Sequence, residues 1–298
     1  MPRPVAVITG AARGIGLESA RRLSPTHRVA LLDIDAAGAE AAAGAIGGDA
    51  VWAACDITLA DSVAAAVDDI VERCGGIDVA IANAGIATTG GMRHLDPDVL
   101  AAQLDVNLVG SWRFIHACLP YVIARRGYVL GIASAAAIVA PIGIGFYASS
   151  KAGFEHLLDV LRIEVSHLGV DVGIAFFSWI DTDMVRGVAT HQPAFAKLRS
   201  DIRGPAGRTL PVSAAGAAIA DAVAHRRRTV VAPGFVRVAY VLRGLIGPLV
   251  ERDSRRRAAT VDRATADLVA ERGPFDAAMR PGDVGTRAPD PAHERRRA

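Results

Sequence analysis

Thr9-Gly10-Ala11-Ala12-Arg13-Gly14-Ile15-Gly16 decides the fold of this chain, and it directly follows the apolar run at residues 5–8. Glycines in this position permit a tight turn and allow a pyrophosphate to approach the amide groups at a helix N-terminus. Asp33 ends the next apolar run, at the distance typical of a carboxylate that binds an adenosine ribose. The stretch therefore predicts a dinucleotide-binding turn between a first strand and a first helix.

Short apolar runs alternate with alanine-rich stretches outward from this turn. Strands are predicted at Val5–Thr9, Val29–Asp33, Ala50–Ala54, Val79–Ala82, Tyr128–Ala133, Val170–Phe177 and Thr229–Ala232. Helices are predicted at Ile15–Leu23, Ala36–Ile46, Ala60–Arg73, Pro97–Ala124, Tyr147–Leu168 and Ser213–His225. Alternation of this kind predicts the α/β class, a doubly wound, parallel, seven-stranded sheet (a Rossmann fold) with helices on both faces. Covering both faces explains why the strands are apolar throughout.

The C-terminal segment differs in composition from the rest. Residues 251–298 hold 20 charged residues in 48, against 21% in the whole chain, and four prolines. We expect residues 1–250 to form one Rossmann-type domain that carries binding and catalysis. Residues 251–298 are predicted to be a mobile or loosely docked tail, with one helix near Ala259–Glu271, that the core fold does not need.

Composition excludes several functions. A net charge of +2 gives no reason to expect nucleic-acid binding. Cys55, Cys74 and Cys118 are odd in number and far apart, so they predict neither disulfides nor a metal site and favour a reducing compartment. Only four residues precede the first apolar run, which leads us to expect a cytoplasmic protein. Residues 127–150 lack charge, but their glycines and Pro141 indicate a strand, a loop and a helix start, not a membrane span.

A second motif, Tyr147-Ala148-Ser149-Ser150-Lys151, has the pattern Y-x-x-x-K. Together with the pattern T-G-x-x-x-G-I-G at residues 9–16, it makes the chain resemble the short-chain dehydrogenase/reductase family in its single-domain form, from about residue 5 to residue 232. The resemblance implies a catalytic tetrad of Asn107, Ser134, Tyr147 and Lys151. It also implies dimers or tetramers of identical chains, formed through the helices predicted at residues 97–124 and 147–168.

The resemblance assigns further residues to cofactor binding. Asp56 matches a family residue that contacts adenine, and Ile180 and Thr182 match residues that meet the nicotinamide carboxamide. The full set is Gly10, Arg13, Gly14, Ile15, Gly16, Asp33, Asp56, Ile57, Asn83, Ala84, Gly85, Tyr147, Lys151, Ile180 and Thr182. One departure follows the sixth strand, where Phe177-Ser178 replaces the usual Pro-Gly.

The spacing of Tyr147 and Lys151 suits proton transfer. Residues four apart share one face of a helix. A free tyrosine has a pKa of about 10, and a nearby ammonium would favour its phenolate. Lysine occurs at only two of the chain's 33 basic positions, so its presence at Lys151 indicates a need for a compact ammonium. The Ser134 hydroxyl would hold the substrate oxygen, and Asn107 would anchor a relay water, as the family implies.

The predicted cofactor is NAD. Asp33 can accept hydrogen bonds from both adenosine ribose hydroxyls, and a 2′-phosphate would face its charge. Arg13 is the opposing feature, because a basic side chain in the glycine turn can bind that phosphate.

The sequence thus predicts an NAD-dependent oxidoreductase that acts on an apolar secondary alcohol or ketone, with Tyr147 as the acid and base. The alternatives are a cofactor-binding regulator with little turnover and an NADP-dependent ketone reductase. Contact of Val236–Val250 with a membrane surface is a further alternative that is not favoured, because this stretch could instead pack on the sheet or form an oligomer interface.

Overall fold

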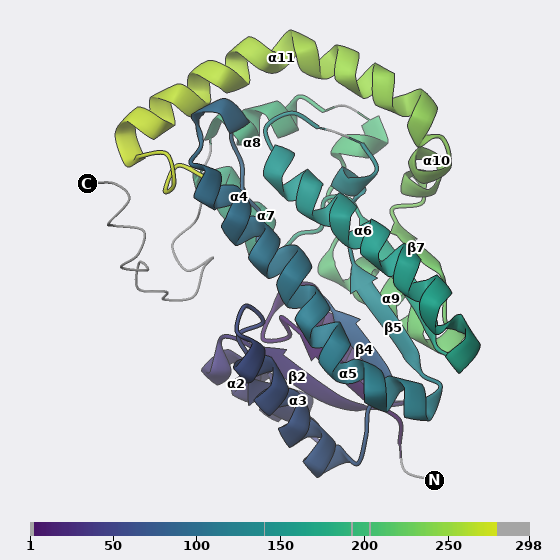
Figure 1. Ribbon diagram of the computed structural model, residues 1–298. Coiled ribbons are helices and arrows are strands. Elements are labelled where there is room, and N and C mark those ends of the chain that lie inside the picture. Colours follow the sequence, from purple (N-terminus) through teal and green to yellow (C-terminus); the bar gives the residue numbers. More distant parts are fainter. Residues whose placement is uncertain (1–2, 140, 192, 203, 279–298) are drawn as a thin grey trace.

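A computed structural model describes residues 3–139, 141–191, 193–202 and 204–278 of the chain. Its centre is one seven-stranded parallel sheet with the order β3-β2-β1-β4-β5-β6-β7 (Figure 1). The strands are β1 (Val5–Thr9), β2 (Arg28–Asp33), β3 (Val51–Ala54), β4 (Val79–Ala82), β5 (Tyr128–Ile132), β6 (Asp171–Phe177) and β7 (Thr229–Ala232). The order reverses between β1 and β4, where a doubly wound fold places its ligand. The predicted seven-stranded α/β fold is confirmed.

Helices cover both faces of this sheet. On one face lie α3 (Ala60–Cys74), α5 (Ser111–Arg125) and α6 (Gly145–Val165), whose apolar side chains join one core cluster. On the other face lie α1 (Gly14–Leu23), α2 (Ala36–Ile46) and α9 (Val212–His225), which form a second cluster. Alternate strand residues serve the two clusters, as in β1, where Val7 belongs to the first and Ile8 to the second.

The helix predicted at Pro97–Ala124 is interrupted. It consists of α4 (Pro97–Leu104), a π-helical segment (Asp105–Gly110) and α5. A Cβ atom on Gly110 would lie 2.8 Å from the carbonyl oxygen of Ile57, so the segment passes very close to the loop after β3. Single π-helical turns often occur at functional sites, and this one carries Asn107.

Among the described residues, three short helical segments lie between β6 and α9. These are α7 (Asp183–His191), α8 (Pro193–Ser200) and a 3-10 turn (Gly204–Gly207). An isolated parallel bridge between Ile180 and Leu210 closes the base of this region.

The C-terminal region differs most from the prediction. After α10 (Phe235–Val241), helix α11 runs without interruption from Arg243 to Arg272, so the predicted boundary at residue 250 falls inside it. Figure 1 shows α11 arching over the molecule from α10 to the loop before α4. Thr265 is buried there, and its Oγ1 accepts a hydrogen bond of 2.8 Å from the Gly91 amide.

Charged contacts hold the same end of α11. Asp262 accepts hydrogen bonds from both Nε and Nη2 of Arg93, at 2.5 and 2.7 Å, and lies 2.9 Å from His94 Nε2. These bonds hold the pKa of the Asp262 carboxyl at about 2, below its ordinary value. Specific polar contacts thus attach the C-terminal half of α11, although its composition predicted loose docking. Residues 279–298 of the predicted tail lie outside the described residues.

Among the described residues, no helix combines the length and the apolar character that crossing a bilayer requires.

Candidate active site

The glycine turn closes tightly against the end of β4. Gly10 has a positive φ of 64°, which glycine tolerates best. A Cβ atom on Gly16 would lie 2.2 Å from the Gly10 carbonyl oxygen, so only glycine fits there. Asn83 Nδ2 donates hydrogen bonds to the carbonyl oxygens of Thr9 and Gly10, at 2.9 and 3.0 Å. The result is a compact backbone cradle at the N-terminus of α1, where helix amides favour a phosphate.

Thr9 extends this cradle to the loop after β4. Its Oγ1 accepts hydrogen bonds from the amides of Asn83 and Ala84, at 3.0 and 3.1 Å. Thr9 was quoted as the first residue of the glycine motif but was given no role; a threonine that ends an apolar run was a usable signal. The predicted residues Asn83, Ala84 and Gly85 therefore lie beside the glycine turn.

The Asp33 carboxylate lies over the same turn and is 8% exposed. Its Oδ2 accepts a hydrogen bond of 2.9 Å from the Ala12 amide, and its Oδ1 accepts one of 3.0 Å from the Asp35 amide. Asp35 instead caps α2, because its own carboxylate accepts from the Gly38 amide. Arg13 is exposed, and no ion pair joins it to another residue within the described parts of the chain.

Asp56 and Ile57 follow β3 at the same edge of the sheet. Asp56 Oδ1 accepts hydrogen bonds from the amide and hydroxyl of Thr58, at 2.9 and 2.7 Å. The Asp56 amide in turn donates a hydrogen bond of 3.0 Å to the Ser62 hydroxyl oxygen. Ile57 is buried. Both predicted adenine-side residues are thus fixed in place near the ends of β2 and β3.

Ser134 and Tyr147 are brought together above β5. Ser134 follows the strand and accepts a hydrogen bond of 3.2 Å from the Ala136 amide, which holds the serine side chain at the start of a short 3-10 turn. Its hydroxyl is also hydrogen-bonded to Tyr147 in the first turn of α6. Burial raises the pKa of the Tyr147 phenol above its ordinary value, and the bond to Ser134 partly opposes this rise.

Close packing of α6 on β5 positions Lys151. A Cβ atom on Gly131 would lie 2.2 Å from Leu158 Cδ1 and 2.8 Å from Phe154 Cε1, so this glycine admits the helix. Lys151 is 5% exposed, and its Nζ donates a hydrogen bond of 2.9 Å to the Ile132 carbonyl oxygen. Burial lowers the pKa of Lys151 to about 8.

This arrangement refines the expected influence of Lys151 on Tyr147. The sequence analysis expected the ammonium to favour the phenolate, but burial dominates the pKa of Tyr147, and Ser134 is its hydrogen-bond partner. The physical reason is that loss of hydration disfavours the charged form of each side chain, the buried ammonium and the half-buried phenol alike.

Asn107 lies fully buried behind these residues. Its Oδ1 accepts a hydrogen bond of 2.8 Å from the Ile86 amide, and its Nδ2 donates to Ile86 O and Ser150 Oγ at 2.9 and 3.0 Å. A Cβ atom on Gly85 would lie 3.0 Å from Asn107 Oδ1 and 3.4 Å from Lys151 Nζ. The carboxamide therefore links the π-helical segment, the loop after β4 and α6.

The loop after β6 reaches the glycine turn. A Cβ atom on Gly14 would lie 3.7 Å from Thr182 Cγ2, and Ile180 is buried. Phe177, which stands in place of the usual proline, is buried at the end of β6. Arg199 of α8 stacks on Trp179, with its guanidinium carbon 4.7 Å from the ring centroid. Sequence spacing could not reveal this contact, because it joins a strand end to a distant helix.

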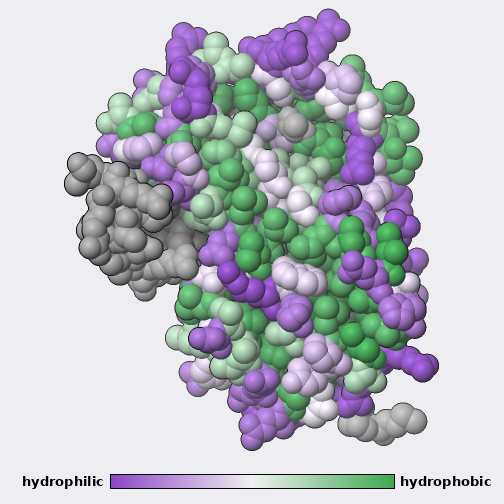
Figure 2. All heavy atoms as spheres, in the orientation of Figure 1, coloured by the Kyte–Doolittle hydropathy of each residue, from purple (hydrophilic) through white to green (hydrophobic). Residues whose placement is uncertain are grey.

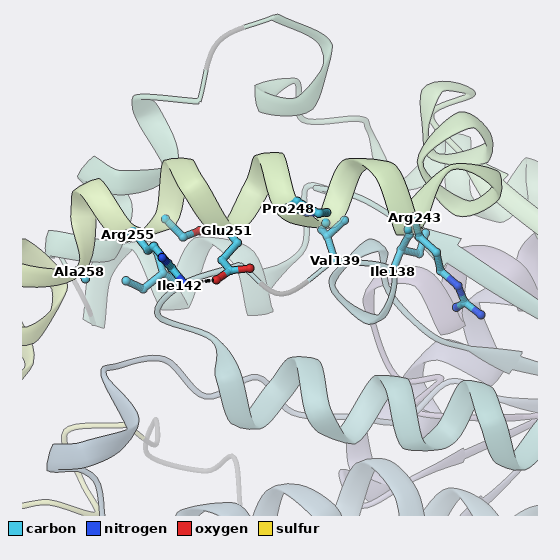
Figure 3. A pocket seen from close by; sticks show the side chains of 11 residues that line it. Ile138, Val139, Ile142, Arg243, Pro248, Glu251, Arg255 and Ala258 are labelled. Carbon is cyan, nitrogen blue, oxygen red and sulfur yellow. Dashed lines mark hydrogen bonds and ion pairs between the residues drawn. The ribbon is translucent and has the colours of Figure 1, made fainter.

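A groove of about 600 Å³ runs between α11 and the loop that follows Ser134. Figure 3 shows Ile138, Val139 and Ile142 facing the underside of the helix, with Arg243 toward one end. Toward the other end, Arg255 donates a hydrogen bond of 2.6 Å to Glu251. The groove thus has apolar walls and cations near its ends, and α11 supplies one wall that the sequence analysis did not foresee.

The residues fit a nicotinamide dinucleotide. The glycine cradle suits a pyrophosphate, and the Asp33 carboxylate lies where a ribose would meet it. Among the described residues, the buried Lys151 ammonium has one hydrogen-bond acceptor, Ile132 O, for its three N–H groups. A group with several hydroxyl oxygens would satisfy the remaining donors.

Comparisons with known proteins agree with this geometry. A cis-4-hydroxycyclohexanecarboxylate dehydrogenase of Sinomonas cyclohexanicum is 32% identical over 209 residues, 68% of this chain and 82% of that protein. A human 3-hydroxyacyl-CoA dehydrogenase type-2 is 33% identical over 183 residues, 56% of this chain and 70% of that protein. An actinorhodin polyketide ketoreductase variant, solved with NADPH, superposes with a TM-score of 0.72 at 26% identity. The match covers 79% of this chain and 99% of that one.

Residues 4–193 match the model of the short chain dehydrogenases. The matched span contains the glycine turn, Asp33, and all four residues of the predicted tetrad. The chain therefore belongs to the short-chain dehydrogenase/reductase family of oxidoreductases.

Proposed function

We propose that this oxidoreductase uses NAD to interconvert an apolar secondary alcohol and its ketone, with Tyr147 as the acid and base. The observation that carries the proposal is the hydrogen bond between Tyr147 and Ser134, with the buried Lys151 one helical turn away. A nicotinamide dinucleotide supplies or accepts the hydride when it is bound.

Ser134 and Tyr147 would handle the substrate oxygen and its proton. The Ser134 hydroxyl would donate a hydrogen bond to the oxygen as negative charge develops there. In alcohol oxidation Tyr147 would take the hydroxyl proton, and in ketone reduction it would return one. With a pKa of about 8, Lys151 is mostly protonated at neutral pH and provides a positive charge near the phenol. Asn107 would hold the loop at Ile86 and, as the family implies, a relay water.

Preference for NAD rests on Asp33. Two backbone amides hold this carboxylate at the end of β2, so it cannot easily swing away from a ribose. A 2′-phosphate at that position would meet a like charge in a nearly buried site. Arg13 is exposed in the glycine turn and remains the side chain that could favour NADP instead.

The apolar wall of the groove, formed by the loop that follows Ser134, supports the proposed substrate class. Ile138, Val139 and Ile142 line it and follow Ser134 closely in the chain, so a substrate held at Ser134 could extend along them. Arg199, a cation between β6 and β7, stacks on Trp179 and donates a hydrogen bond to Thr209. A carboxylated or phosphorylated substrate would have to displace those contacts, or compete with the ion pairs that Arg243 and Arg255 form with Glu155 and Glu251.

We also propose a homodimer or homotetramer in a reducing compartment such as the cytoplasm. Val160, Ile163 and Leu168 are exposed on α6 or just after it, and Ile163 is 74% exposed, which favours contact with a second chain. The three cysteines are free thiols, and burial raises the pKa of each. The proposed reaction itself requires one further partner, a small-molecule substrate.

A panel of secondary alcohols and ketones tests the proposal. Reduction or oxidation of the nicotinamide is followed by absorbance, with NAD and NADP in parallel. We expect turnover with apolar substrates and a kcat/KM at least tenfold higher with NAD. Binding of NAD without turnover of any member would favour the cofactor-binding regulator, and a preference for NADP would favour the ketone reductase that uses Arg13.

A further inference from the structure

An exposed apolar face covers α10 and the first turns of α11. It consists of Val238, Val241, Leu242, Leu245 and Leu249, whose exposed fractions are 56, 71, 42, 72 and 66%. Figure 2 shows hydrophobic residues gathered at the upper right, over these helices. Large apolar side chains that remain this exposed on adjoining helices mark a surface that contacts something else.

The next turns of α11 add positive charge to the same face. Leu245, Leu249, Arg252 and Arg256 recur every three or four residues, so they share one side of the helix. Arg252 and Arg256 are exposed, and within the described parts of the chain neither forms an ion pair. The groove-lining residues Gly244, Gly247 and Glu251 lie on a different side of α11.

We propose that this face of α10 and α11 binds the surface of an anionic lipid bilayer. Leu245 and Leu249 would enter the boundary between headgroups and acyl chains, while Arg252 and Arg256 would contact lipid phosphates. The position of α11 at the periphery allows such contact, because the helix arches over the outside of the fold (Figure 1). The leucines and arginines together distinguish this face from an ordinary charged surface helix.

Charge complementarity favours a bilayer over a second copy of the chain. Two copies that met through this face would bring the same unpaired arginines into their contact. An anionic bilayer instead offers negative charge next to an apolar layer. This inference concerns only the face of α10 and α11, so it stands whether or not the proposed reaction is correct.

Co-sedimentation with vesicles tests the inference on the full-length protein. One vesicle preparation is phosphatidylcholine alone, and the other contains about one third phosphatidylglycerol. We expect binding to the anionic vesicles that weakens as salt is raised. The paired replacement Leu245→Gln and Leu249→Gln should weaken binding by about tenfold or more. The pair Arg252→Gln and Arg256→Gln should weaken it roughly 20-fold at low salt.

Leu59→Gln, at an exposed leucine just before α3, is the matched control and should bind like the unchanged protein. Circular dichroism verifies that each variant is folded. Failure of the unchanged protein to sediment with anionic vesicles would overturn the inference, as would equal binding by all variants. A leucine pair that alters the oligomeric state, with no vesicle binding by the unchanged protein, would show that a second copy covers this face instead.

Discussion

Replacing Lys151 with methionine tests whether the protein buries a charge at its active site. Lys151 is 5% exposed, and burial lowers its pKa from the ordinary 10.5 to about 8. Between these two values the unfolded chain binds more protons than the folded protein does. In the unchanged protein, Lys151 therefore makes the free energy of unfolding rise with pH across this window. Lys151→Met lacks this contribution.

The magnitude follows from the two pKa values. At pH 7 the side chain is protonated in both states, whereas at pH 9.5 most folded molecules have lost the proton and most unfolded ones have kept it. Between pH 7 and pH 9.5, the free energy of unfolding of the unchanged protein should therefore rise by about 2 kcal/mol relative to that of Lys151→Met. Other titrating groups cancel in this difference.

Urea unfolding at the two pH values measures the effect. Lys197 is the chain's other lysine and is exposed, so Lys197→Met is a matched control whose difference from the unchanged protein should not vary with pH. A pH-independent difference for Lys151→Met would refute the reasoning, because it would show that Lys151 keeps an ordinary pKa in the folded protein.

Three further predictions concern other contacts. Charge repulsion by Asp33 should make kcat/KM roughly 30- to 150-fold higher with NAD than with NADP. Asp33→Ala should reduce this ratio, mainly by weakening the use of NAD. An unchanged ratio would exclude Asp33 as the cause. Tyr128→Phe removes the hydroxyl that donates a hydrogen bond of 2.7 Å to Arg227 O, and denaturant unfolding should show a loss of about 1–2 kcal/mol. Deleting residues 252–298 removes Asp262 and Thr265 and should lower the melting temperature by several degrees, whereas an unchanged value would restore the view that this segment is dispensable.

Local patterns carried most of the fold prediction. Apolar runs such as those of β1 and β4 needed no distant partner to be recognised, and the glycine turn has its own spacing. The break in the helix at Asp105–Gly110 could not be predicted in this way. It accompanies the approach of Gly110 to the Ile57 carbonyl, which is a contact between segments far apart in the chain.

A helix near Ala259–Glu271 was predicted, but the full extent of α11 and its attachment were not, for a related reason. Its charges and prolines indicated a tail, yet a few contacts by Asp262 and Thr265 suffice to attach it to the loop before α4. At the candidate site, the structure places Ser134 beside Tyr147, two residues that the resemblance assigned to one tetrad. The resemblance did not predict that Lys151 bonds to Ile132 O, because that geometry depends on how closely Gly131 lets α6 approach β5.

Kinetic analysis of Tyr147→Phe tests the central proposal most directly. The phenol is the one group proposed to move the proton, and phenylalanine preserves its ring and packing. With NAD and the best alcohol of the panel, the account predicts that kcat falls by at least a thousandfold, while the affinity for NAD, measured by fluorescence titration, changes less than about threefold. Turnover within tenfold of that of the unchanged protein would contradict the assignment of Tyr147 as the acid and base.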